Sequence, residues 1–206
     1  MIQLYGLKLS NYYSLTKALL IEKGLEFEEV NAPPTQKEDN LARSPMGKMP
    51  SIGVGGSYMS ESLAIAIYLE RLKPQPALLP ADPFAAGKVI ELVCHIKLDI
   101  ELVARRCLPE AFFGKAVSDE VKASTDADLT KGMKAVARLF SGKPYAYGDA
   151  LSLADFYAYF CFGLASGITQ KMFSRDLLEG HENIKDVMAR MAKHPSVAKV
   201  EAEKAG

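Results

Sequence analysis

Apolar and polar positions change their spacing several times within the first 76 residues. The apolar run from Ile2 to Tyr5 predicts a strand, and a helical spacing follows from about Asn11 to Lys23. Ser10 occupies the N-cap position of this helix, and Gly24 supplies a left-handed stop after it. The later elements predicted in this segment are a strand at 27–30, a short helix at 36–43 opened by a capping box at 35–38, a hairpin of strands 51–54 and 57–59 around Gly55-Gly56, and a helix that ends near Lys73.

The order of these elements is β-α-β-α-β-β-α. Because a helix separates the first two strands, we expect them to be parallel with a right-handed crossover. The last two strands form a hairpin and must be antiparallel. Residues 1–76 therefore predict a mixed four-stranded sheet with helices on its faces.

The rest of the chain predicts helices and no convincing strand. A semi-rigid linker is expected at 77–84, in a stretch crowded with prolines: Pro74, Pro76, Pro80 and Pro83. Helical patterns then cover about 85–113, 118–140, the apolar segment opened by a capping box at Ser152–Asp155, 183–193 and 196–203. Residues 85–206 are thus expected to form an all-helical domain.

Composition narrows the class of protein. The 206 residues include 25 Lys plus Arg and 25 Asp plus Glu, so the formal net charge is zero. A nucleic-acid binder normally carries a basic excess, so we expect no nucleic-acid partner. No apolar run approaches the roughly 20 residues that cross a bilayer, and the start of the chain lacks the basic flank of a signal peptide. With three dispersed cysteines, the sequence predicts a cytoplasmic protein without disulfides or membrane contact.

Metal-ligating patterns are not found either. Cys94 and His95 are adjacent on a predicted helix and therefore point in different directions, whereas two ligands on one face need a spacing of three or four. His181-Glu182 lacks a second His four residues on. We therefore expect no metal site.

Two segments of the first 76 residues are candidates for ligand binding. In the predicted fold, Pro50 can follow a cis bond, which would leave backbone groups of Met49 free to pair with an extended peptide, although a proline at a sheet edge is the simpler explanation. Glu61 and Ser62 at a helix start are ordinary caps, or else they capture a ligand's ammonium and carboxylate groups.

These segments resemble the glutathione-site motifs of the cytosolic glutathione S-transferases. The resemblance covers the whole chain and rests on the order and spacing of Ile2-Gln3-Leu4-Tyr5-Gly6, Ser10-Asn11-Tyr12-Tyr13, Gly47-Lys48-Met49-Pro50 and Glu61-Ser62-Leu63-Ala64-Ile65. It implies a thioredoxin-like first domain, a helical second domain that completes a hydrophobic substrate site, a homodimer, and glutathione as cosubstrate.

The resemblance also implies residue roles. Met49, before Pro50, would pair its main chain with the cysteinyl part of glutathione, and Glu61 with Ser62 would hold the γ-glutamyl group. Lys48 would lie near the glycyl end, where Gln36 and Lys37 are further candidates. Ser10 matches the catalytic Ser or Cys of the family, with Tyr12 as the alternative sulfur donor, and Asn11 stands where many relatives have Pro.

A serine hydroxyl is sufficient for the chemistry expected at Ser10. Lowering a thiol pKa from about 8.5 by two units needs about 2.7 kcal/mol of preferential stabilisation of the thiolate. A hydrogen bond to a charged group gives about 1.5–3 kcal/mol, and a helix N-terminus adds roughly 0.3–1 kcal/mol. The expected activity is conjugation of glutathione to small, largely apolar electrophiles. The alternatives are a non-catalytic binding or regulatory protein and a glutathione-dependent isomerase or peroxidase on the same fold.

Overall fold

The computed structural model describes residues 1–205. The chain divides into two compact units, of which residues 1–78 with 193–205 form the first and Leu79–Ala192 the second. Each unit has its own hydrophobic core.

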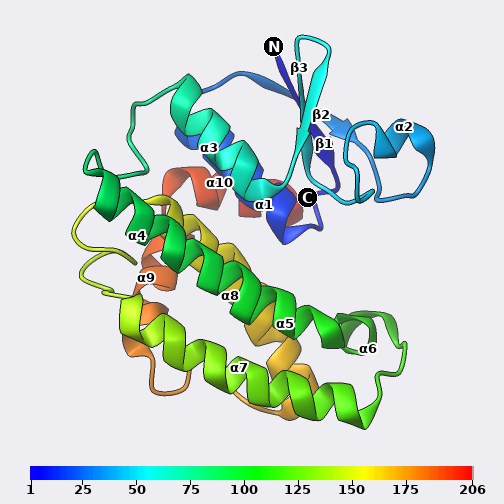
Figure 1. The fold of residues 1–206 in the computed structure, drawn as a ribbon, viewed down its shortest axis with the longest axis vertical. Helices are drawn as coiled ribbons and strands as arrows, with labels where there is room; N and C mark the ends of the chain where they lie inside the picture. Colours follow the sequence, from blue (N-terminus) through cyan, green and yellow to red (C-terminus); the bar gives the residue numbers. More distant parts are fainter. Residues whose placement is uncertain (206) are drawn as a thin grey trace. The chain divides into compact units, whose positions relative to one another are not determined.

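The first unit is built on a four-stranded sheet with the strand order β2-β1-β3-β4. Strand β1 pairs in parallel with β2, and β3 pairs antiparallel with β4, as expected from the sequence. Strand β1 also pairs antiparallel with β3, a pairing that the sequence did not specify. Helices α1 and α3 lie on one side of the sheet and the short α2 on the other (Figure 1). The elements are β1 (Ile2–Gly6), α1 (Asn11–Glu22), β2 (Phe27–Asn31), α2 (Glu38–Leu41), β3 (Ser51–Val54), β4 (Ser57–Ser60) and α3 (Ser62–Leu72).

The hairpin turn predicted in this unit is confirmed, and the helix start predicted for α2 is not. Gly55 and Gly56, with φ of 56° and 83°, make the tight turn between β3 and β4. The expected capping box at 35–38 is wrong, because α2 begins only at Glu38 and its N-cap is Lys37. The hydroxyl of Thr35 instead accepts a hydrogen bond from the Lys37 N–H at 3.4 Å, so it closes a turn before the helix.

The core of the first unit lies between the sheet and helices α1 and α3. Leu4 and Ile52 from the sheet are buried with Leu15, Leu19 and Ile65 from the helices. Helix α10 (Pro195–Ala205) packs on α1 and belongs to this unit, although sequence order alone had grouped residues 193–206 with the helical domain. Burial of Val197 and Val200 accounts for this packing.

The second unit is helical and is organised around α8. Its elements are α4 (Pro83–Cys94), the π-helical η1 (His95–Glu101), α5 (Leu102–Ala104), the 3-10 turn η2 (Arg105–Cys107), α6 (Leu108–Phe113), α7 (Asp119–Leu139), α8 (Leu153–Phe173) and α9 (Glu182–Ala192). The helix expected over 85–113 is therefore an irregular series, and it starts at Pro83, which occupies the first helical position. The expected capping box of α8 is confirmed, with the Asp155 carboxylate accepting from the Ser152 N–H at 2.8 Å.

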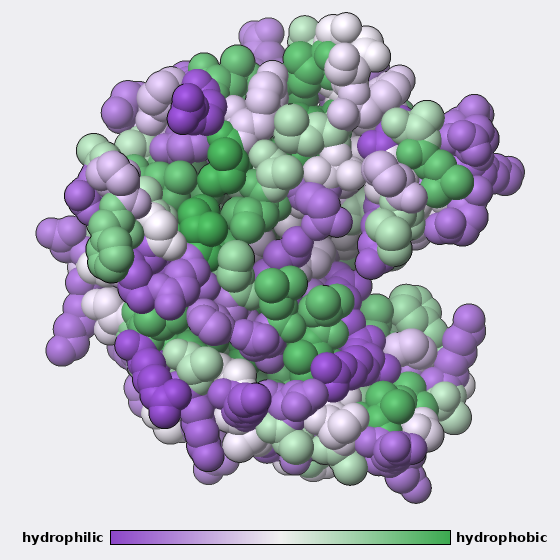
Figure 2. Space-filling model, in the orientation of Figure 1, coloured by the Kyte–Doolittle hydropathy of each residue, from purple (hydrophilic) through white to green (hydrophobic). Residues whose placement is uncertain are grey.

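The surfaces of both units mix hydrophilic and hydrophobic side chains on the face drawn in Figure 2. Within residues 1–205, no helix is both long enough and apolar enough to span a membrane. The same residues contain no group of three or more His, Cys, Asp or Glu side chains arranged to hold a metal ion.

Candidate active site

The register of the sheet brings three separate segments to one end of the first unit. Ser51 at the start of β3 pairs with Tyr5 near the end of β1 and with Ser60 at the end of β4. Strand β3 runs opposite to both of its neighbours. The loop after β1, the residues before β3 and the helix start after β4 therefore lie at the same end of the sheet. These are the segments that carry Ser10, Met49-Pro50 and Glu61-Ser62.

Ser10 caps the N-terminus of α1. Its backbone is extended, with φ of −77° and ψ of 125°, and its Oγ accepts a hydrogen bond from the Tyr13 N–H at 3.3 Å. Its carbonyl accepts the first intrahelical bond, from the Ser14 N–H at 2.9 Å. Accepting a bond uses a lone pair of Oγ and leaves the O–H proton for donation. The capping role and a donor role toward a ligand are therefore compatible in one side chain.

The two tyrosines after Ser10 have different surroundings. Tyr13 is buried, and its hydroxyl donates to Oε2 of Glu29 at 2.5 Å. Burial, together with this bond to a carboxylate, raises the pKa of the Tyr13 phenol. Tyr12 is half-buried. Tyr13 is thus committed to a structural contact, and Tyr12 stays the alternative to Ser10.

Met49 and Pro50 lead directly into β3. The peptide bond between them is cis, which the sequence allowed but did not decide, and Pro50 is buried while Met49 is half-buried. Gly6 at the end of β1 lies against this segment and against α1. A Cβ added at Gly6 would lie 2.5 Å from the Tyr13 ring and 3.4 Å from Cβ of Met49. Only glycine therefore allows the three segments to approach this closely.

Glu61 adopts a backbone conformation that L-residues rarely occupy. Its φ is 71° and its ψ 111°, and it stands as the exposed N-cap of α3, with its carbonyl accepting from the Ile65 N–H at 2.9 Å. Such a conformation costs of order 1–3 kcal/mol and is found mainly at ligand sites. Ser62 follows as a buried residue in the first turn of α3. The strain at Glu61 is a feature that the sequence did not reveal.

Lys48, Gln36 and Lys37 lie in the segment between β2 and β3. The backbone N–H of Lys48 donates to Oγ of Ser44 at 3.2 Å, and its side chain is exposed. Gln36 donates from Nε2 to the Met46 carbonyl at 3.2 Å, which ties the two ends of the loop together. Lys37 is exposed as the N-cap of α2. Gln36 therefore has a structural contact, and Lys48 and Lys37 present their ammonium groups to solvent.

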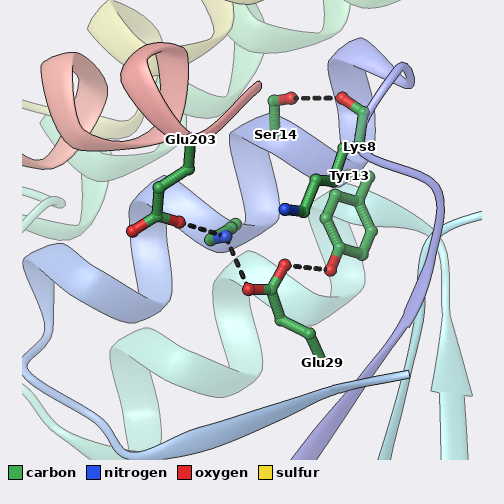
Figure 3. A network of polar contacts seen from close by, with 6 residues as sticks. Lys8, Tyr13, Ser14, Glu29 and Glu203 are labelled. Carbon is green, nitrogen blue, oxygen red and sulfur yellow. Dashed lines mark hydrogen bonds and ion pairs between the residues drawn. The ribbon is translucent and has the colours of Figure 1, made fainter. Parts of the chain in front are cut away.

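A network of charged side chains joins α1, β2 and α10, and the sequence did not predict it. Nζ of Lys17 lies 2.6 Å from Oε1 of Glu29 and 2.5 Å from Oε2 of Glu203, and Glu29 also accepts the Tyr13 hydroxyl (Figure 3). Burial by itself would lower the pKa of Lys17, but the bonds to Glu203 and Glu29 outweigh it and raise that pKa. The available sequence signal was a lysine inside the largely apolar run Leu15–Leu20.

Two family models match the chain. One describes the glutathione S-transferase N-terminal domain and matches residues 4–77, and the other describes the glutathione S-transferase C-terminal domain and matches residues 110–204. A protein named glutathione S-transferase from Pseudomonas putida is 39% identical over 204 residues, which are 99% of this chain and 93% of that protein. The chain belongs to the glutathione S-transferase family.

Two other relatives differ in name. A probable maleylacetoacetate isomerase 1 of Drosophila melanogaster is 35% identical over 112 residues, covering 54% of this chain and 45% of that protein. The structure of a maleyl pyruvate isomerase, described as a bacterial zeta-class glutathione S-transferase, aligns with a TM-score of 0.76 at 24% identity, covering 96% of this chain and 95% of that one. This last similarity supports the fold, a thioredoxin-like domain followed by helices.

Proposed function

We propose that this protein is a glutathione transferase in which Ser10 stabilises glutathione as a thiolate for attack on small, largely apolar electrophiles. The observation that carries the proposal is the sheet register that gathers Ser10, Met49 and the start of α3 at one end of β1, β3 and β4. The match to both glutathione S-transferase family models supports it.

The binding roles follow from the chemistry of each group. The carboxylate of Glu61 pairs with the ammonium of the γ-glutamyl part, while the Ser62 hydroxyl and the N–H groups that open α3 hold its carboxylate. The main chain of Met49, before the buried Pro50, pairs with the cysteinyl part. Lys48, exposed on the neighbouring loop, attracts the glycyl carboxylate.

The reaction needs no further catalytic group. Ser10 donates its O–H to the sulfur, and the partial positive charge of the α1 N-terminus adds to the stabilisation of the anion. The thiol proton leaves to solvent, and the thiolate forms a sulfur–carbon bond as the electrophile's leaving group departs with its electron pair. With a chloronitrobenzene the products are the aryl thioether and chloride.

The proposal is tested by retention on immobilised glutathione together with turnover of 1-chloro-2,4-dinitrobenzene. We expect both, and we expect free glutathione to elute the protein. Retention without turnover of several electrophiles would favour a binding or regulatory protein, and failure of both would overturn the proposal.

An isomerase acting through glutathione is the second candidate, because one relative is named a probable maleylacetoacetate isomerase. An isomerase would convert the cis double bond of an acid such as maleylacetoacetate to trans and leave the glutathione concentration unchanged, whereas conjugation consumes one glutathione for each product formed. Measuring free thiol during turnover separates the two, and formation of glutathione disulfide would instead indicate a peroxidase.

We further propose that the protein is cytoplasmic and forms a homodimer. Sedimentation equilibrium at micromolar concentration measures the oligomeric state directly.

A further inference from the structure

Lys17 connects three elements of the first unit. Its side chain on α1 is only 4% exposed, and its ammonium forms ion pairs with Glu29 on β2 and Glu203 on α10. The two carboxylates are 34% and 37% exposed, so the ammonium is buried while each partner reaches it from the edge of the unit. A buried ammonium strongly requires such partners, because leaving it unpaired costs several kcal/mol.

The contacts continue from Lys17 to the first turn of α1. Glu29 uses Oε1 for Lys17 and Oε2 for the hydroxyl of Tyr13, at 2.6 Å and 2.5 Å. Tyr13 in turn donates its backbone N–H to Oγ of Ser10 and presses its ring against Gly6. Ser10, Tyr13 and Lys17 are spaced by three and four residues, so they follow one face of the helix.

Other charged and polar groups lie near the Lys17–Glu203 ion pair. Lys8, Ser14 and Lys204 line the small hollow beside Tyr13, Lys17 and Glu203, and Ser14 donates its hydroxyl to the Lys8 carbonyl at 3.3 Å. The Lys8 ammonium, projecting from the loop that precedes Ser10, also attracts Glu29. The loop, the helix turn and α10 are therefore held by one set of contacts.

We infer that Lys17 and Glu203 are positioning residues for the reaction: their ion pair fastens α10 to α1 and β2, and through Glu29 and Tyr13 it fixes the orientation of the Ser10 hydroxyl. This inference rests on the proposed sulfur-donor role of Ser10. Without Glu203, Lys17 has Glu29 as its remaining carboxylate partner in the network, and it competes with Tyr13 for the oxygens of Glu29. Tyr13 and the turn that orients Ser10 then lose part of their support.

The chain offers a matched control on the same helix. Lys23 is 1% exposed, forms an ion pair with Glu70 on α3 and donates to the Pro76 carbonyl at 2.6 Å. It lies 13 residues after Ser10, or about 20 Å along a helix, whereas Lys17 lies seven residues after Ser10. Glu70→Gln thus disturbs the buried lysine that caps the C-terminus of α1 without touching the contacts around Ser10.

The test compares Glu203→Gln, Glu70→Gln and Ser10→Ala by ultraviolet titration of the bound glutathione thiolate, with kcat, KM and Tm measured in parallel. We expect Glu203→Gln to raise the pKa of the bound thiol by about 0.5 unit, which leaves about threefold less thiolate at pH values well below that pKa, and to lower kcat there by a similar factor. KM for glutathione stays within about twofold, because the groups that hold its two ends are intact. Glu70→Gln lowers Tm and leaves the thiol pKa unchanged.

A double variant tests whether the two residues act as one unit. Lys17→Met with Glu203→Gln should shift the thiol pKa no more than Lys17→Met alone, since the pair is already broken. If Glu203→Gln lowers Tm but does not shift the thiol pKa, while Ser10→Ala does shift it, the positioning role is wrong and the proposed function stands. If Ser10→Ala also has no effect, the donor role of Ser10 is wrong and the positioning role fails with it.

Discussion

Tyr13 and Ser10 share a hydrogen bond in which the Tyr13 backbone N–H donates to Oγ of Ser10 over 3.3 Å. The bond closes the first turn of α1 and leaves the hydroxyl with a proton to donate. An oxygen that already accepts a hydrogen bond becomes a stronger donor, because the two bonds polarise each other. The cap therefore both starts α1 and presents a donor to the sulfur of glutathione in the proposed complex.

Replacing Ser10 with Ala should weaken thiolate formation and helix stability together. We expect the pKa of bound glutathione to rise by about 1–2 units, since a hydrogen bond to a charged group is lost. The free energy of unfolding should fall by about 0.5–2 kcal/mol from the lost cap. Ultraviolet thiolate titration and urea unfolding measure the two effects.

Ser118→Ala is the matched control for the cap. Ser118 opens α7 and accepts from the Val121 N–H at 3.3 Å, the same geometry as at Ser10. It should lose similar stability with an unchanged thiol pKa. An unchanged thiol pKa in Ser10→Ala, with a shift in Tyr12→Phe, would transfer the donor role to Tyr12.

Glu61 offers a test of backbone strain separate from ligand binding. Glu61→Gly and Glu61→Ala both remove the carboxylate, so both should raise KM for glutathione by at least tenfold, as expected for a lost charged hydrogen bond of about 1.5–3 kcal/mol. Glycine adopts the φ of 71° without the steric cost that a Cβ brings. Glu61→Gly should therefore be more stable than Glu61→Ala by about 1 kcal/mol, measured by urea unfolding. Equal stability of the two variants would show that the backbone at Glu61 is unstrained in solution.

Asp155 should be among the most sensitive polar positions of the second unit. It is fully buried and accepts from the Ala146 N–H at 2.7 Å and the Ser152 N–H at 2.8 Å. In Asp155→Asn an NH2 group faces one of these donors, so we expect a loss of about 2–4 kcal/mol in unfolding free energy. Asp82→Asn is the control, because exposed Asp82 accepts one N–H, that of Ala85, and Asn caps equally well. Similar losses in both variants would contradict the argument from burial.

The stability of the first unit should depend on acid through Glu29. Burial alone would raise the pKa of Glu29, but its bonds to Lys17 and Tyr13 lower it below the ordinary 4.5. The contribution is present above pH 4.5 and is lost as pH falls through the lowered pKa. In Glu29→Gln, urea unfolding between pH 3 and 7 should show less acid destabilisation than wild type, by under about 1 kcal/mol because the carboxylate is partly exposed. A deficit that is the same at every pH would show that the loss is one of packing.

Local patterns predicted much of the fold because they depend on neighbours in sequence. Gly55-Gly56 specified the hairpin, Ser10 and Ser118 specified helix starts, and the Ser152–Asp155 spacing specified a capping box. The capping box predicted at Thr35 is wrong because the Thr35 hydroxyl accepts from the nearer N–H of Lys37. The sequence pattern is the same for such a turn and for a helix N-terminus.

The sequence pattern around Lys23 did not predict its burial or its partners. The sequence placed it at the end of the helix predicted from about Asn11, and it does follow α1 directly. Its burial against Glu70 and the Pro76 carbonyl depends on residues 47 and 53 positions away. These partners of Lys23 depend on how α1 packs on α3. The spacing of residues within α1 therefore does not predict them.

The sequence by itself determined the order of strands and helices along the chain, the caps of α1 and α8, and the family motifs that mark Ser10, Met49, Glu61 and Ser62. The tertiary structure decided the register that gathers these residues, the positive φ of Glu61 and the union of α10 with α1 through Lys17 and Glu203. Strand pairing and buried ion pairs join residues far apart in the chain, and their free energy appears only once the intervening chain has folded.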